Sequence, residues 1–540
     1  MKRILNIKWM HSLLLSVLLM GFSSCIDYED FNKNPVVATT IDPNSQLSYI
    51  QLCMGGDWLM EQPFAYYYSG FVQQLQGDWS ATHFGGEYLI DDAQFQQPWE
   101  RIYTCHLKNL ADILWRTEAD VEQKNINAVA RILKCYFFLI LTDMYGDIPY
   151  FEAEQGYITG NVTPKFDEQE QIYKDMHKEL LEAEEQLDEN ADKLTGDIIY
   201  SGDLKKWRKF ANTLNFRIAM RLVKVAPELA EEWVTTICNI ESGLLGVGDD
   251  ALIHYMDLLD WDETEFRRNG LAQLWRSREN APMCYFCTTM WDKLKTTNDP
   301  RLLILGRCYA EDSTDPFLRT DLTDFIMEKA PKQLESIEAI KPGFYWWDNW
   351  PAGFMDGDTY YGKECRPQLN KGFIKGDSPA IFISYAETEL LLAEAKLRWP
   401  TINDSKTVET HYSNGVKAAM GLLKNFDLGE EVSNTEMASY LSRNPLPSDK
   451  DGQLQFINEQ LWILHLINPS EAYSNWRRSG YPVLKPSTEY GAAVKDSRTI
   501  PRRLKYPLFE QTYNPTGYYE AVGRMGGEDN WNCRIWWDKE

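Results

Sequence analysis

The chain has 540 residues, 44% of them hydrophobic and 25% charged, and its formal net charge is −25. This composition is ordinary for a globular protein with a large core. An acidic surface without a basic stripe repels nucleic acid and phosphate-rich ligands, so we expect no nucleic-acid partner.

Residues 1–24 have the features of a bacterial export signal. Lys2 and Arg3 precede an apolar run, Met10 to Met20, that is too short to span a bilayer. Small residues then lead to Cys25, and the segment resembles a lipoprotein signal with a lipobox. The resemblance implies that Cys25 is acylated and becomes the mature N-terminus. The alternative is ordinary secretion with a chance cysteine.

The segment after Cys25 is expected to be a lipidated tether, residues 25–45. It begins with the acidic cluster Asp27 to Asp30, which resembles the surface-export signal of lipoproteins in the Bacteroidetes. We predict no transmembrane helix after residue 24, because no later apolar run looks long enough. The acyl chains on Cys25 would be the only membrane anchor, each contributing ~0.8 kcal/mol per buried CH₂.

Residues 46–540 are predicted to form a single, mostly α-helical domain. A first helix is expected over 46–58. Apolar residues then recur at helical spacing in successive pairs, which the pattern places at 98–119 with 126–145, 167–187 with 204–225, 381–399 with 406–424, and 452–467 with 470–479. Paired helices without a strict sequence period indicate a tetratricopeptide-like scaffold of helical hairpins, residues 46–237 and 378–540. The helix 381–399 is expected to bury several faces, with Phe382 and Leu390 on one of them.

Residues 238–377 have a different character, because helical periodicity fades and glycine, proline, aspartate and aromatic residues increase. The densest aromatic stretch is 341–361, KPGFYWWDNWPAGFMDGDTYY. A long irregular insertion in a compact protein is usually functional. We therefore predict a large loop-rich, ligand-binding insertion here.

Apart from Cys25, nine cysteines are scattered without a framework. Cys284 and Cys287 form a single C-x-x-C, with neither a second pair nor a nearby histidine to complete a zinc site. Free thiols or a surface disulfide are favoured over metal or redox chemistry.

No motif indicates catalysis. The histidines fall in no recognised motif, and G-x-S-x-G, H-E-x-x-H and P-loop patterns are absent from the sequence. Asp356-Gly357-Asp358 lacks the rest of a calcium loop and is better explained as a turn. We expect a protein that is not an enzyme, with no cofactor and no metal.

Several separated stretches together are similar to one family. They are FLILTDMYGDIPY (138–150), YAETELLLAEAK (385–396), WRRSGYPVL (476–484), IPRRLKYPLFE (500–510) and WWD (536–538). In this order, and after a lipoprotein signal, they resemble the SusD-like (SusD/RagB) outer-membrane nutrient-binding lipoproteins of Bacteroidetes, in particular the second SusD-like subgroup. The match is poorest over 240–380. We expect the arginine pairs of these stretches to be structural.

The resemblance implies a fold of tetratricopeptide pairs and a partner, a SusC-like TonB-dependent outer-membrane transporter on which the protein sits as a lid. It also implies a binding protein that hands over oligomers, usually glycans. The predicted function is that of a cell-surface lipoprotein of the outer membrane that captures oligosaccharides and delivers them to the transporter. The alternatives are a peptide-binding protein of the same transport type, and a structural lid with weak ligand binding.

The candidate ligand-binding residues are aromatic, because flat rings cover the apolar face of a sugar while polar side chains bind its hydroxyl groups. The first group is Trp346, Trp347 and Trp350 with Asp348 and Asn349. The second is Trp79 with Asp78, expected on a loop between helices at a stage where this family commonly uses one. Trp275 is a third, weaker candidate. For each tryptophan the alternative is burial in the core.

Overall fold

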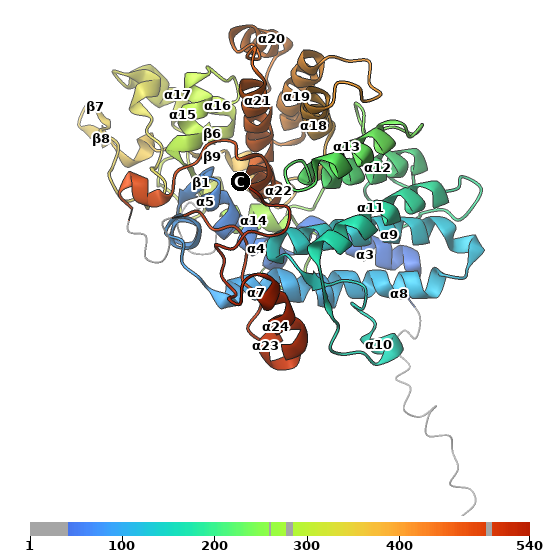
Figure 1. Cartoon of the computed structure of the whole chain (residues 1–540). Helices are drawn as coiled ribbons and strands as arrows, with labels where there is room; N and C mark the ends of the chain where they lie inside the picture. The colour runs from blue at the N-terminus through green and yellow to red at the C-terminus, as the bar shows by residue number, and fades with distance from the viewer. Residues whose placement is uncertain (1–40, 259–260, 277–283, 493–498) are drawn as a thin grey trace, which may run out of the picture.

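The computed structural model describes residues 41–258, 261–276, 284–492 and 499–540. The export signal, the acidic cluster and Cys25 lie outside these residues. Most of the described chain is helical, and two neighbouring blocks of helices form its frame (Figure 1).

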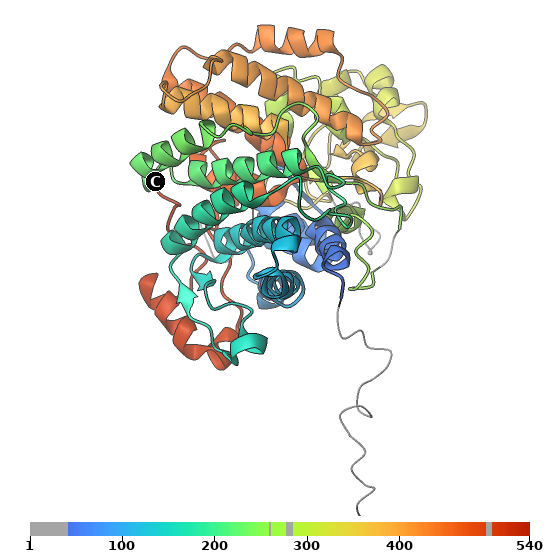
Figure 2. The same ribbon diagram turned by 90° about the vertical axis from the view of Figure 1, so that its right-hand side faces the viewer.

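The N-terminal block is a stack of antiparallel helices in which α8 contacts α9, α9 contacts α11, α11 contacts α12, and α12 contacts α13. Figure 2 shows these helices layered side by side. Their bounds are α8 Lys108–Thr117, α9 Lys124–Tyr145, α11 Gln169–Gln186, α12 Leu204–Arg221 and α13 Pro227–Cys238. The predicted hairpins are therefore confirmed, with ends shifted by a few residues.

Shorter helical segments precede this stack, and one more, α10, lies between α9 and α11 in the chain. The first helix begins at a proline and is capped by the carboxylate of Asp42, which accepts a hydrogen bond from the Asn44 backbone amide (3.3 Å). The segments are α3 Pro43–Gly56, α4 Trp58–Pro63, η1 Phe64–Tyr68, α5 Ser69–Phe71, α6 Trp79–Ala81, η2 Thr82–Gly86, α7 Asp92–Arg101, η3 Ile102–Leu107 and α10 Gly156–Thr159.

The C-terminal block contains two further helical hairpins, in which α18 packs on α19 and α21 packs on α22. Their bounds are α18 Tyr385–Arg398, α19 Val408–Leu422, α20 Asn434–Arg443, α21 Lys450–Leu464 and α22 Pro469–Ser479, followed by α23 Glu510–Tyr513 and α24 Pro515–Arg524. The hairpins expected at 381–399 with 406–424 and at 452–467 with 470–479 are confirmed.

The start of α18 differs from the sequence prediction. Residues Ala380–Ile383 form strand β10, which pairs antiparallel with β4, Ala251–Ile253. The helix begins only after Ser384, whose hydroxyl caps it by accepting a hydrogen bond from the Glu387 amide (3.2 Å). Phe382 is thus buried from a strand and not from the helix. Strand pairing with a distant segment overrides the local helical spacing.

Residues 238–377 hold more regular structure than the sequence indicates. A four-stranded antiparallel sheet runs in the order β1-β5-β9-β6, with β1 Leu75–Gly77, β5 Cys284–Phe286, β9 Gln368–Leu369 and β6 Gly306–Arg307. The same region contains the helices α14 Gly270–Arg276, α15 Thr288–Thr296, α16 Leu302–Leu305 and α17 Thr323–Lys329, and the hairpin of β7 Phe354–Asp356 with β8 Thr359–Tyr361. In the N-terminal part, β2 Ile148–Pro149 pairs with β3 Phe166–Asp167. Because β1 comes from the N-terminal part, the sheet ties this region to the helical frame.

One helix is long and apolar enough to pass for a membrane span, contrary to the sequence prediction. Among the described residues this is Val121–Tyr145, and 78% of its apolar window is buried inside the protein. This span consists of the short helix η4 (Val121–Gln123) and α9, and most of its apolar side chains belong to the core of the protein.

The nine cysteines within the described ranges are all free, which confirms the free-thiol alternative. Burial raises the pKa of both Cys284 and Cys287 well above the usual value. Reactive thiols need a lowered pKa, so this pair has the opposite character.

Candidate ligand-binding surface

The candidate site is built where strand β1 ends. Gly77 has a φ of +105°, and a Cβ there would come within 2.4 Å of the Ile340 side chain, so only glycine fits. Its carbonyl accepts a hydrogen bond from the Trp346 backbone amide (2.7 Å). This contact joins the segment after β1 to the aromatic segment 341–350.

Asp78 starts the next short helix. Its carboxylate accepts hydrogen bonds from the amides of Ala81 (2.9 Å) and Ser80 (3.1 Å), which is N-cap geometry. Burial raises the pKa of Asp78 to about 7. This residue therefore positions Trp79 and does not reach the surface. Residues 79–86 are helical turns, α6 and η2, instead of the expected loop.

Two pairs of stacked rings follow from this arrangement. The indole of Trp79 stacks on His83, one helical turn later, with ring centroids 4.4 Å apart and 19° between planes. The indole of Trp347 stacks on Tyr345 at 4.6 Å and 9°. In each pair the smaller ring packs against one face of the indole and helps to hold it in place.

The two pairs are joined by polar contacts. The Tyr345 hydroxyl lies 3.4 Å from His83 Nδ1 and donates a hydrogen bond to Glu87 (3.1 Å). The Thr82 hydroxyl donates to the Phe344 carbonyl (3.1 Å) and accepts from the Gly77 amide (2.8 Å). Segments more than 250 residues apart in the chain are thereby locked together.

Trp350 completes the surface from a tight turn. The Asp348 carboxylate accepts a hydrogen bond from the Tyr345 amide (2.9 Å), and Asn349 has a φ of +48°. Arg366 donates to the carbonyls of Asp348 (3.0 Å) and Asn349 (2.7 Å). These contacts hold the turn without the ligand.

We call Trp79, His83, Tyr345, Trp347 and Trp350 the aromatic platform. The three indoles are 52%, 43% and 44% exposed, far more than a core tryptophan. Asn349 is also exposed, and Asp348 is partly so. Flat rings with amide and carboxylate groups beside them can stack on apolar ring faces and accept or donate hydrogen bonds at their edges.

Besides Asp78, two further predicted residues do not belong to this surface. Trp275 is 4% exposed, packed on α14 within the core, so its ring face is not available there. Trp346 is half-buried and stacks on Tyr285 (6.3 Å, 15°), with the edges of Trp347 and Trp350 against it. It serves as a support for the exposed indoles.

The sequence prediction missed the two supporting rings. His83 could have been found from its spacing, because it follows Trp79 by four residues and side chains at that spacing meet on a helix. Tyr345 carries no such signal, since its place beneath Trp347 depends on the turn at Asp348.

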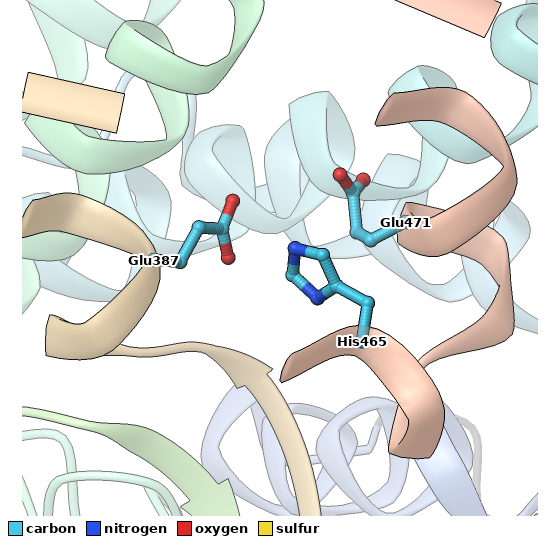
Figure 3. A group of neighbouring side chains, drawn as sticks. All are labelled: Glu387, His465 and Glu471. Carbon is cyan, nitrogen blue, oxygen red and sulfur yellow. The ribbon is translucent and has the colours of Figure 1, made fainter. Parts of the chain in front are cut away.

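Elsewhere, the side chains of Glu387, His465 and Glu471 converge inside the protein (Figure 3). One possible ligand atom of each lies within 4.8 Å of those of the other two. Both carboxylate oxygens of Glu387 accept hydrogen bonds from Arg217 (2.7 Å each), and Arg221 binds Glu471 (2.6 Å). Burial lowers the pKa of His465. The carboxylates are already paired with arginine, so the cluster joins α12, α18 and α22 as an ion-pair network and offers a cation few free ligand atoms.

Comparison with known proteins identifies the family to which the chain belongs. A family model described as SusD-like, "Susd and RagB outer membrane lipoprotein", matches residues 57–538. The chain belongs to the SusD-like family. A search of curated proteins found no match.

Solved structures agree with this SusD-like assignment. A protein titled "Bacteroidetes AC2a SusD-like" has 34% identity and a TM-score of 0.85, covering 93% of this chain and 100% of that one. A protein titled "chitin-binding protein" has 32% identity and a TM-score of 0.78, covering 92% and 100%. A chitin-binding SusD homologue from Flavobacterium johnsoniae, at 21% identity, TM-score 0.68 and coverage of 92% and 98%, shows the same fold.

The family and its structures confirm the mostly helical, tetratricopeptide-like architecture. SusD-like proteins are outer-membrane lipoproteins and binding proteins. Membership supports a glycan-binding role at the cell envelope.

Proposed function

We propose that this SusD-like protein is a cell-surface lipoprotein that captures oligosaccharides on the aromatic platform and delivers them to a SusC-like TonB-dependent transporter. The observation that carries the proposal is the exposure of Trp79, Trp347 and Trp350, two of them on stacked partners. Side chains held in place before binding lose little entropy when the ligand arrives.

The platform suits a sugar chain for a physical reason. A pyranose ring has an apolar face of C–H groups and an edge of hydroxyl groups. Indoles cover the face with a large rigid area, and Asn349 and Asp348 lie beside them for the edge. The titles of two structural relatives name chitin, so chito-oligosaccharides are the first ligands to test.

Anchoring of the protein to the outer membrane would allow it to deliver its ligand to the transporter. A lipid on Cys25 would keep the binding protein at the outer membrane, where its transporter lies. Ligand held beside the transporter has a raised effective concentration at the pore. In this proposal the protein binds and transfers its ligand without chemical change.

The test is isothermal titration of the mature protein with chitotetraose and with cello-, malto- and xylo-oligosaccharides. The variant Trp347→Ala/Trp350→Ala should weaken binding by at least about tenfold, which is ~1.4 kcal/mol of lost ring contact. Tyr513→Ala, which removes a ring that is also exposed but lies on α23, is the matched control and should bind as the parent does.

Unchanged affinity in both Trp79→Ala and the double variant would show that the platform is not the ligand site. Binding of peptides but of no saccharide would favour the peptide-binding alternative. Binding of neither would favour a structural lid.

A further inference from the structure

A second concave surface lies on the helical scaffold. A groove of about 640 Å³ lies between α8 and α11, and the segment 150–155 contributes to its lining. Its floor is one stripe of α9, formed by Asn127, Arg131, Lys134 and Phe138, which are spaced by three or four residues and so share a face. We call this the helical groove. Figure 1 shows α8, α9 and α11 on the opposite side of the molecule from β7 and β8, which follow the platform in sequence.

Aromatic side chains are exposed at the helical groove. Trp115 of α8 is 52% exposed, and Phe151 of the segment 150–155 is 47% exposed. Phe151 packs edge-on against Tyr150 (4.9 Å, 89°). Exposure of large rings at the edge of a concave surface of this size is typical of ligand sites.

The start of the segment 150–155 is held in place by hydrogen bonds. The carboxylate of Asp167 accepts hydrogen bonds from the amides of Tyr150 (3.1 Å) and Phe151 (2.9 Å). The Tyr103 hydroxyl donates to the Pro149 carbonyl (2.5 Å) just before them. The segment therefore has a defined shape before any ligand binds.

Glu154 in this segment is unusual in two respects. Its φ is +59°, a left-handed conformation that glutamate rarely adopts and that is often retained at functional sites. No described residue hydrogen-bonds or forms a close ion pair with its carboxylate. Burial raises the pKa of Glu154 to about 7 against the opposing effect of the Lys108 charge. A partly buried acceptor to which no described residue donates a hydrogen bond thus lines the helical groove.

The cations of the floor are already neutralised. Arg131 binds both Glu179 (2.9 Å) and Glu182 (2.6 Å), and Lys134 lies 3.7 Å from Glu179. The groove therefore does not favour an anionic ligand. The amides of its floor and wall are also engaged, since Gln186 donates to Asn127 (2.9 Å) and to the Lys124 carbonyl (2.9 Å). Few groups remain to pair with the backbone of an extended peptide.

We propose that the helical groove is a second carbohydrate site, which binds neutral saccharide rings against Trp115 and Phe151 and accepts a hydroxyl hydrogen bond at Glu154. This proposal rests on the proposed function, because it assigns a second contact to the same class of ligand. Two separate sites would hold distant parts of one long polysaccharide, or of two chains, with greater avidity than either site alone.

The experiment uses isothermal titration of the mature protein with chitotetraose, or with the member of the saccharide panel that the parent protein binds. The platform variant Trp347→Ala/Trp350→Ala should keep a weak residual site. Adding Trp115→Ala/Phe151→Ala should reduce this residual binding by at least about tenfold, whereas adding Tyr513→Ala should leave it unchanged.

The Glu154 variants refine the test in the same platform-deficient background. Glu154→Ala should weaken the residual binding, and Glu154→Gln should preserve it, because an amide oxygen still accepts a hydroxyl hydrogen bond. Equal thermal midpoints for the two variants exclude a folding effect.

The outcomes separate the two proposals. If the platform variant has no residual binding, or if the groove substitutions leave it unchanged, the helical groove is not a saccharide site while the platform remains one. If the parent protein binds no saccharide, both proposals are wrong.

Discussion

Several arginines of the C-terminal part each bind a specific carboxylate. Arg478 is fully buried and donates to both oxygens of Glu394 (2.8 Å each). Burial alone would raise the pKa of Glu394, but Arg478 and Arg398 outweigh it and hold that pKa far below its usual range. Arg502 and Arg503 likewise bind Asp538 and Asp529. The structural role predicted for the arginine pairs is confirmed.

Arg478→Met should destabilise the protein by ~3–5 kcal/mol, because it leaves the Glu394 carboxylate buried without its main partner. Urea denaturation measures the change. Arg534→Met removes an exposed arginine with acidic neighbours and should cost less than about 1 kcal/mol. Similar losses for the two variants would contradict the argument.

The buried carboxyl group of Glu61 predicts that the stability of the protein falls as pH rises. Burial, and then the charge of Asp57, raises the pKa of Glu61 to about 8. The folded state therefore holds a proton that the unfolded state releases above its own pKa of about 4.3. The contribution of Glu61 to the free energy of unfolding is therefore fully present below the unfolded-state pKa and is lost as pH rises toward 8.

Glu61→Gln should remove this loss. Relative to the parent, the variant should gain ~3–5 kcal/mol of stability between pH of about 4 and pH 9. Thermal unfolding across this range, with the exposed Glu520→Gln as control, measures the gain. A difference that does not grow with pH would contradict the assignment.

At the scale of elements, helices α18 and α19 pack closely against each other. A Cβ on Gly415 of α19 would come within 2.6 Å of Leu390 Cγ and 3.1 Å of the Leu390 amide nitrogen of α18. The absence of a side chain lets these two helices approach closely. The last turn of α19 contains Gly421, where an added Cβ would meet no atom within 4 Å.

Gly415→Ala should therefore destabilise the protein by ~1–3 kcal/mol through overpacking. Gly421→Ala is the matched control and should be neutral or stabilising by up to ~1 kcal/mol, because alanine is the better helix former. Chemical denaturation of the pair provides the comparison, and an equal effect at both positions would contradict the close contact.

At the scale of the whole molecule, the platform joins parts of the chain that are far apart in sequence. The segment after β1 and the segment 341–350 meet because β1 lies in a sheet whose other strands come from residues 284–369. Substitution of Gly77 would disturb this junction, because a Cβ there would clash with Ile340 and displace the carbonyl that accepts a hydrogen bond from the Trp346 amide.

The membrane anchor is a prediction at the same scale. Cys25→Ala should move the protein from the membrane fraction to the soluble fraction, because acyl chains contribute ~0.8 kcal/mol per buried CH₂. Cell fractionation and labelling with a radioactive fatty acid measure the change. Cys533→Ala, at a cysteine near the C-terminus, is the control. Retention of the Cys25 variant in the membrane would contradict lipidation.

The sequence alone determined the paired helices, because the 3.6-residue spacing of apolar side chains is a local signal that burial rewards. It also located the aromatic segment 341–350 and Trp79. Only the tertiary structure decided that Trp79, Trp347 and Trp350 are exposed while Trp275 is buried, because exposure depends on which distant segments cover a ring. The strand at 380–383 and the groove beside Trp115 were missed for the same reason: strand pairing and concavity arise from contacts between elements, which no local spacing encodes.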